Sequence, residues 1–122
     1  MGTFAAGQVV LLPFPFSDLS RSKFRPALLL ADAVHGDWIA CQITSNPYAD
    51  THAVLLTDGD FTSGGLQRLS HVRPGKLFTA NISLFATTAG VIAADKLNET
   101  RNVVVALIRG QAKRALTPMA LT

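Results

Sequence analysis

The stretch from Gly7 to Leu30, GQVVLLPFPFSDLSRSKFRPALLL, holds two apolar runs separated by a polar loop. Residues 8–14 are dominated by Val and Leu, which predicts one strand, and residues 27–31 predict a second. The loop, residues 15–24, is longer than most connections, and Arg21, Lys23 and Arg25 follow one another with no acid between them. A cationic loop mounted on an apolar frame is suited to bind an anion.

The rest of the chain continues this pattern of short apolar runs broken by turn residues. Further strands are predicted over residues 38–44, 53–57, 66–70, 72–78 and 85–92, with loops at 58–60 and 62–65. The runs are continuous rather than alternating, which predicts burial on both faces, as in a small barrel. From about Ala94 the apolar spacing becomes helical, and Gly110 stands where a helix ends. The sequence therefore predicts a mainly β fold with a C-terminal helix.

Length and composition are those of one folded domain. The chain has 122 residues, a net charge of +3 and a single cysteine, Cys41, in an apolar run. We expect one domain over residues 1–122 with a loosely ordered tail, 111–122. Cys41 cannot form an internal disulfide, and no apolar run approaches the ~20 residues of a membrane span, so we expect a cytoplasmic protein with no membrane partner.

Four motifs in order along the chain resemble the MazF/PemK-like endoribonuclease toxins of bacterial toxin–antitoxin systems. They are G-x-V-V-L-L-P-F-P-F-S-D-L-S from Gly7, R-P-A-L-L-L from Arg25, Q-I-T-S from Gln42 and V-R-P-G-K-L-F from Val72. The resemblance implies an SH3-like small barrel with a C-terminal helix, assembled as a homodimer. It also implies a growth-inhibiting toxin that cuts single-stranded RNA, chiefly messenger RNA, and a cognate acidic antitoxin as protein partner.

Arg25 and Thr44 are the predicted catalytic residues, and both match positions to which the family assigns that role. Arginine is cationic at physiological pH and its forked donors suit a phosphate, so Arg25 can neutralise charge that develops in a transition state. Thr44 is a poor base, so we expect it to hold the scissile phosphate by a hydrogen bond. The alternative is that Arg25 only caps a strand and pairs with Asp18 or Asp32, and that Thr44 only begins a turn.

Further residues are expected to bind the substrate because they lie in cationic or loop segments near the predicted strand ends. They are Phe16, Lys23, Ser45, Asn46, Arg68, Ser70 and Arg73. No Asp or Glu occurs between Phe61 and Ala94, so Arg68 and Arg73 add a second cationic segment to that of the loop. The alternative is that these charges are scattered over a solvated surface.

Two positions depart from the family pattern. Some members carry an acid two residues after the arginine at this point, where it can transfer protons, whereas this chain has Ser70. Gln8 stands where Asp is common. Ser70 offers no carboxylate base, and the adjacent His71 would point to the opposite face of a regular strand, so the sequence leaves the general base unassigned.

The sequence contains no glycine-rich phosphate loop and no pairing of His with Cys at metal-ligand spacing. We therefore expect no metal and no cofactor. The predicted activity is metal-independent, sequence-specific cleavage of RNA by attack of the 2′-hydroxyl, leaving a 2′,3′-cyclic phosphate and a 5′-hydroxyl. The alternative is a barrel of the same fold that binds nucleic acid or protein without cutting.

Overall fold

The secondary structure comes from a computed structural model, which describes residues 3–14 and 23–111. The strands are β1 (Gln8–Phe14), β2 (Lys23–Asp32), β3 (Asp37–Thr44), β4 (Val54–Leu56), β5 (Phe61–Gly64), β6 (Ser70–Asn81) and β7 (Thr87–Ile92). The helix is α1 (Ala94–Ile108), and two single 3-10 turns are η1 (Asp58–Asp60) and η2 (Ile82–Leu84). The prediction of a mainly β fold with a C-terminal helix is confirmed.

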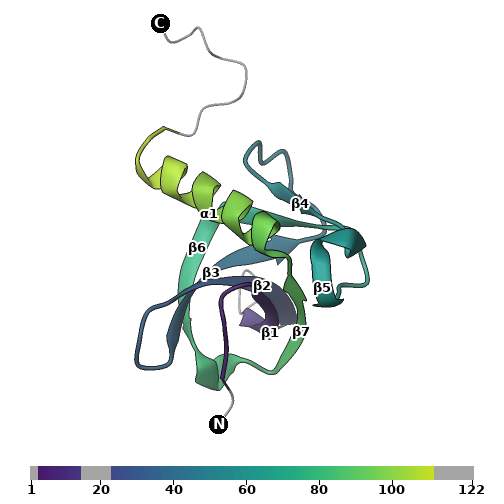
Figure 1. The fold of residues 1–122 in the computed structure, drawn as a ribbon, viewed down its shortest axis with the longest axis vertical. Helices are drawn as coiled ribbons and strands as arrows, with labels where there is room; N and C mark the ends of the chain where they lie inside the picture. Colours follow the sequence, from purple (N-terminus) through teal and green to yellow (C-terminus); the bar gives the residue numbers. More distant parts are fainter. Residues whose placement is uncertain (1–2, 15–22, 112–122) are drawn as a thin grey trace, which may run out of the picture.

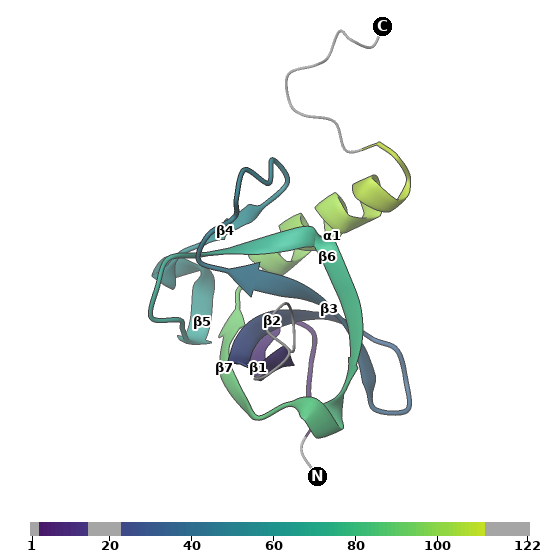
Figure 2. The same cartoon turned by 180° about the vertical axis from the view of Figure 1, so that it is seen from behind.

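The strands form one antiparallel sheet that curls strongly on itself, as Figures 1 and 2 show. Their order is β4-β6-β3-β2-β1-β7-β5, so among the described strands only the β1–β2 and β2–β3 pairs join strands that follow one another in the chain. The register shifts within four of the pairings, β1 with β7, β2 with β3, β3 with β6 and β5 with β7. Such irregularities bend strands and increase their twist, which allows a sheet of this width to curl.

Both faces of the central strands are buried, as their continuous apolar runs predict. Neighbouring residues of one strand enter different cores: Val9 and Leu28 pack on one face, and Val10 and Leu29 pack on the other. The first core continues beneath the helix. The second is closed by Trp38 and Ala80 and by the partly buried Phe4, Phe78 and Phe85.

Helix α1 covers the first core and packs against β6, as seen in Figure 1. Its buried residues are Leu97, Thr100 and Val104, which recur at helical spacing on one face. Arg101 ties the helix to the sheet, because its Nε and one terminal nitrogen donate to the Leu30 carbonyl at 3.1 and 2.7 Å. In residues 3–14 and 23–111, no helix has the length and apolar character needed to cross a membrane.

The strand boundaries differ from the predicted ones around β5 and β6. Residues 66–70 are not a strand but a loop that ends at Ser70, and residues 61–64, predicted largely as loop, form β5. Two glycines allow β5 to form. A Cβ on Gly64 would overlap the Ala89 carbonyl, and one on Gly90 would lie 2.6 Å from the Ser63 carbonyl oxygen. These contacts let β5 pair closely with β7, and pairing between strands distant in sequence is not visible in local periodicity.

The loop of residues 65–69 connects the two ends of the curled sheet. It leaves β5, which is one edge strand, and enters β6, which lies next to the other edge strand, β4. β6 itself is one long strand rather than two short ones, because Pro74 and Gly75 are accommodated where the β3–β6 register shifts between Cys41 and Gln42. Residues of the 65–69 loop line a cavity at the surface of the sheet.

Two prolines end the ladders at the same corner of the sheet. Pro13 lies beyond the last β1–β7 pair, which is Leu11 with Thr87, and Pro26 lies beyond the last β2–β3 pair, which is Ala27 with Gln42. Proline has no N–H to donate, so it is tolerated where one side of a strand is unpaired. At this corner the β2–β3 pairing ends, although β2 extends back to Lys23 and β3 extends on to Thr44.

Candidate functional site

A cavity of about 550 Å³ opens at this corner of the sheet. Its lining comes from the ends of β1, β2 and β3, from the 65–69 loop, and from β7. The predicted site residues among those that line it are Arg25, Thr44, Ser45, Arg68 and Ser70. Residues separated by more than forty positions in the sequence therefore meet at one cavity.

Arg25 and Thr44 reach the cavity from adjacent strands. The β2–β3 register pairs Ala27 with Gln42, and continuing it by two residues places Arg25 opposite Thr44. The ladder has already ended there because Pro26 lacks an N–H, so the two side chains flank an opening rather than a closed pair of strands. Both residues are partly buried, which holds them in place and leaves them accessible to a ligand.

The Thr44 hydroxyl is part of a tight turn at the end of β3. Its Oγ1 accepts a hydrogen bond from the Asn46 N–H at 3.1 Å and lies 3.1 Å from the Asn46 carbonyl, to which it can donate. The Asn46 side chain in turn accepts from the Tyr48 N–H at 3.0 Å. The hydrogen bond from the Asn46 N–H thus holds the hydroxyl in place. The hydroxyl proton can leave the Asn46 carbonyl and be donated to a ligand oxygen instead.

Arg68 is exposed on the 65–69 loop, and Ser70 fixes the end of that loop. Ser70 is only 5% exposed, and its Oγ donates to the Arg68 carbonyl at 2.8 Å. A buried hydroxyl satisfied in this way holds the backbone that carries Arg68. Ser70 lines the cavity, but its hydroxyl proton is donated to the Arg68 carbonyl. Its main effect on the site is therefore to hold the 65–69 loop in place.

The cavity is electrostatically positive. Arg25 and Arg68 both line it, and none of its described lining residues is an Asp, Glu or His. The two arginines attract an anion, and the adjacent hydroxyls of Thr44 and Ser45 supply neutral hydrogen bonds. Phosphate, with several acceptor oxygens, matches that set of groups.

Of the other predicted substrate-binding residues, Asn46 and Arg73 do not line this cavity, and the side chain of Lys23 lies outside what the structure describes. Asn46 lies beyond Thr44 in the turn, and Lys23 begins β2. Arg73 follows Ser70 by three positions and so faces the other side of β6, where its Nε donates to Asp50 Oδ2 at 2.9 Å. Phe16 lies outside the described residues, as does most of the loop 15–24.

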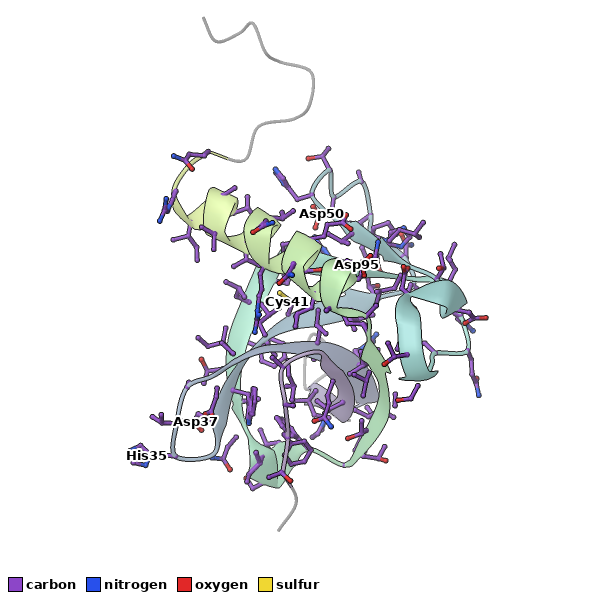
Figure 3. The ribbon with its side chains drawn as sticks, viewed as in Figure 1. His35, Asp37, Cys41, Asp50 and Asp95 are labelled. Carbon is purple, nitrogen blue, oxygen red and sulfur yellow. The ribbon has the colours of Figure 1, made fainter. Side chains whose placement is uncertain are left out.

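The Arg73–Asp50 ion pair joins β6 to the loop between β3 and β4, where Figure 3 labels Asp50. Partial burial raises the pKa of Asp50, but hydrogen bonds from Arg73 and from the His52 N–H outweigh it, so the pKa lies below its usual value. Its carboxylate also anchors the segment that follows the Thr44 turn. Arg73 therefore holds the loop that follows the Thr44 turn and does not itself line the cavity.

His71 is not among the residues that line the cavity. It pairs with Thr44 across β3 and β6 and with Leu55 across β4 and β6, on the face opposite to the buried Ser70. Its Nδ1 is buried and has no hydrogen-bond partner among the described residues. The expectation that Ser70 and His71 cannot both point into the site agrees with this alternation.

Cys41 is buried in the first core, and Figure 3 shows it beneath α1. Burial raises the pKa of its thiol to about 12, so the group is neutral and unreactive at physiological pH. Within the part of the chain that the structure describes, no group of three or more His, Cys, Asp or Glu is placed to hold a metal ion.

Several cavity residues were not singled out from the sequence. Leu11, Pro26 and Ile43 form apolar walls, and Gln67 contributes an amide next to Arg68. The only sequence signal for Gln67 is its position beside a candidate arginine. The sequence does not indicate a function for the apolar residues, because apolar residues in a predicted strand are expected to belong to the hydrophobic core.

The sequence matches no protein-family model and no curated protein. Structural comparison, by contrast, finds close likeness over nearly the whole chain. A MazE–MazF complex from Deinococcus radiodurans is 26% identical, has a TM-score of 0.70, and the alignment covers 92% of this chain and 100% of that one. MazF alone from Deinococcus radiodurans is also 26% identical, with a TM-score of 0.67 and coverage of 89% and 99%.

A more distant structure is an endoribonuclease in complex with its cognate antitoxin from a mycobacterial species. It is 16% identical, with a TM-score of 0.64 and coverage of 93% of this chain and 99% of that one. At that identity the likeness concerns the fold alone. The resemblance stated from the four sequence motifs is confirmed by these structures.

Proposed function

We propose that this MazF-like chain is an endoribonuclease, the toxin of a toxin–antitoxin pair, which cuts single-stranded RNA at the cavity of Arg25 and Thr44. The observation that carries the proposal is the convergence of Arg25, Arg68, Thr44 and Ser45 on one cavity with no acid in its described lining. The fold supports it, because a structurally similar mycobacterial protein is an endoribonuclease that binds a cognate antitoxin.

In the proposed reaction the 2′-hydroxyl of the RNA is the nucleophile. Its oxygen forms a bond to the adjacent phosphorus, and the bond from phosphorus to the 5′-oxygen of the next nucleotide breaks. Solvent takes the proton of the 2′-hydroxyl and returns one to the leaving oxygen. The products are an upstream fragment that keeps the phosphorus as a 2′,3′-cyclic phosphate and a downstream fragment that begins with a 5′-hydroxyl.

Arg25 and Thr44 have separate roles in this scheme. Arg25 neutralises the charge that builds on the phosphoryl oxygens, a contribution that is large when the donor is already held in place. Thr44 turns its proton from the Asn46 carbonyl to a phosphoryl oxygen while it keeps the hydrogen bond from the Asn46 N–H. Arg68 binds the phosphate backbone near the cavity, and Ser45 adds a second hydroxyl.

We also propose partners and a location that follow from this activity. An acidic antitoxin suits a positive cavity, and the Deinococcus radiodurans relative is found with MazE. The chain would act as a homodimer on messenger RNA in the cytoplasm. Recognition of a short RNA sequence would require bases to be splayed from the strand and held in pockets of their own.

The proposal is tested by incubating the purified protein with a long unstructured RNA in EDTA and analysing the product ends. We expect cleavage with cyclic phosphate ends, and we expect DNA of the same sequence to stay intact because it lacks the nucleophile. Arg25→Ala should reduce cleavage by about 100-fold or more. Arg109→Ala is the matched control, because Arg109 is an exposed arginine at the end of α1.

Cleavage of DNA in EDTA, or full activity in Arg25→Ala, would contradict the mechanism. One observation favours the alternative of a binding barrel that does not cut: the described lining of the cavity offers no carboxylate or imidazole to act as a base. RNA bound tightly in an Arg25-dependent way, but left intact across pH and sequence, would establish that alternative.

A further inference from the structure

A second cavity, of about 410 Å³, adjoins the first across the 65–69 loop. Leu66, Gln67 and Arg68 line both cavities, so the loop is a shared wall. On its far side the second cavity is bounded by the end of β4 and by η1. A ligand strand that crosses the loop at Arg68 therefore passes directly from one cavity to the other.

The lining of the second cavity is suited to a flat ring with a polar edge. Leu56, Phe61 and Leu66 provide apolar surface, and Thr57, Asp58 and Gln67 provide hydrogen-bonding groups. Apolar or aromatic surface packs against the faces of a nucleobase, while polar side chains bond to its edge. Arg68, at the junction of the two cavities, is placed for a backbone phosphate.

The two acids of η1 have different environments. Asp60 is used within the protein: its Oδ2 accepts from the Thr57 N–H at 2.7 Å and from the Thr57 hydroxyl at 3.1 Å, and Lys96 lies 3.9 Å from its Oδ1. The Thr57 N–H holds the pKa of Asp60 below its usual value. These contacts make η1 a fixed support.

Asp58 has no such partner within residues 3–14 and 23–111, where it forms no ion pair and no side-chain hydrogen bond. Its carboxylate lies toward the 65–69 loop, since a Cβ built on Gly65 would be 3.9 Å from Asp58 Oδ1. The carboxylate thus lines the second cavity, on a rigid support and with both oxygens available.

We infer that the second cavity binds the base of a nucleotide that flanks the cleaved phosphate, and that Asp58 selects guanine there. A carboxylate only accepts hydrogen bonds, and guanine presents two donors side by side, N1–H and the 2-amino group. Adenine and cytosine present a single amino group on that edge, and uracil places carbonyls on both sides of its one N–H. The inference rests on the proposed function, because it takes single-stranded RNA as the ligand of the adjoining cavity.

The test is a binding measurement that does not depend on cleavage. The probes are two short polyuridine oligonucleotides with 2′-deoxy sugars, which cannot react because they lack the 2′-hydroxyl. One carries a single guanine and the other a single hypoxanthine, which is guanine without the 2-amino group. Fluorescence anisotropy measures their affinity for the wild type, for Asp58→Asn and for Asp32→Asn. Asp32→Asn is the matched control: it removes the same charge at the turn between β2 and β3, where Figure 3 labels His35 and Asp37.

We expect the wild type and Asp32→Asn to bind the guanine oligonucleotide about tenfold more tightly than the hypoxanthine one, as for one hydrogen bond to a charged group. Asp58→Asn should lose that discrimination. Equal affinity for the two oligonucleotides in the wild type overturns the inference without any variant, and so does discrimination that survives in Asp58→Asn.

The outcomes also separate this inference from the proposed function. RNA cleavage with no dependence on guanine or Asp58 would leave the endoribonuclease standing and remove the guanine site. Guanine-dependent binding without cleavage of any RNA would keep the site and refute the nuclease. No binding of any oligonucleotide, with a basic peptide bound through Asp58 instead, would overturn both.

Discussion

Ser70 Oγ donates a hydrogen bond of 2.8 Å to the Arg68 carbonyl, from a side chain that is 5% exposed. Ser70 stands where some MazF/PemK-like proteins have an acid, so its contacts bear on how this chain works without one. The hydroxyl acts on the backbone of the 65–69 loop rather than on a proton of the substrate. That loop is the wall between the two cavities, so the Ser70 hydrogen bond helps to set the shape of both.

Ser70→Ala is expected to lower the free energy of unfolding by about 1 kcal/mol, because it leaves the Arg68 carbonyl without this donor. It should raise KM more than it lowers kcat, since in our proposal Arg68 binds the substrate backbone, and the loop would hold Arg68 less firmly. Thermal unfolding and steady-state cleavage of a fluorogenic RNA measure the two effects. Ser70→Thr, which keeps the hydroxyl, is expected to retain KM; a kcat that falls alone in Ser70→Ala would instead indicate a direct chemical role.

Thr44→Val removes the hydroxyl that both fixes the turn at Asn46 and, in our proposal, binds the phosphate. We expect cleavage to fall by about 100-fold, comparable to the loss of one preorganised donor at a developing charge. Thr44→Ser keeps the hydroxyl and should retain most of the activity. Single-turnover cleavage, with circular dichroism to verify folding, distinguishes the variants, and equal activity of Thr44→Val and wild type would remove Thr44 from the mechanism.

The pH dependence of cleavage reports whether a side chain acts as the base. The described lining of the first cavity contains no carboxylate and no imidazole, so we expect kcat to rise steadily with pH as hydroxide becomes available. A profile measured from pH 5 to 9 on a short RNA tests this, because a histidine with the ordinary pKa of about 6.5 would titrate within that range. A plateau above pH 7 that disappears in His71→Gln would show that His71 takes the proton.

Acid should weaken the protein through the Asp50–Arg73 pair. The pKa of Asp50 is lowered by folding, so its ionised form stabilises the native state above the unfolded pKa of about 3.9, and that stabilisation is lost as pH falls through the lower folded value. At pH 7, Asp50→Asn should cost about 1 kcal/mol of unfolding free energy. The difference from wild type should shrink below about pH 4.

A double-mutant cycle with Arg73→Gln shows whether this loss belongs to the ion pair. Additive effects of the two substitutions at pH 7 would mean that Asp50 acts through the His52 backbone instead. The same variants should leave the cleavage chemistry largely unchanged, because Arg73 and Asp50 do not line the first cavity.

Cys41 should be inert to thiol reagents in the folded protein. It is fully buried in the first core, and its pKa of about 12 leaves almost no thiolate at pH 8. We expect Ellman's reagent to react with it only on unfolding in denaturant, and Cys41→Ala to retain cleavage while losing some stability. Rapid labelling of the native protein would show that the core beneath α1 opens readily.

Much of the architecture follows from local pattern. Continuous apolar runs in residues 8–14 and 38–44 predict strands buried on both faces, and Val9 and Val10 do enter different cores. Helical spacing after Ala94 predicts α1, which ends at Ile108, just before Gly110. These features depend on neighbouring residues only, so they are visible in one sequence.

The β5–β6 region was mispredicted because its structure depends on contacts between distant residues. Gly64 and Gly90 allow β5 to lie close to β7. The pair Gly64-Gly65 permits a close backbone approach, but the sequence does not indicate which strand makes it. The consequence is the 65–69 loop, which bridges the two ends of the curled sheet. Arg68 was singled out for its charge, but its place between two cavities comes from that bridge.

The sequence by itself determined the chemical groups of the site: an arginine before a proline at the start of one strand, hydroxyls at the end of another, and a surrounding stretch without acids. The tertiary structure decided which of them meet. Arg25 and Thr44 come together because continuation of the β2–β3 register places them opposite each other, while Arg73 lies on the face of β6 opposite to Ser70 and is paired with Asp50. Which charges converge depends on register and sheet curvature, and both are set by pairing between strands far apart in the chain.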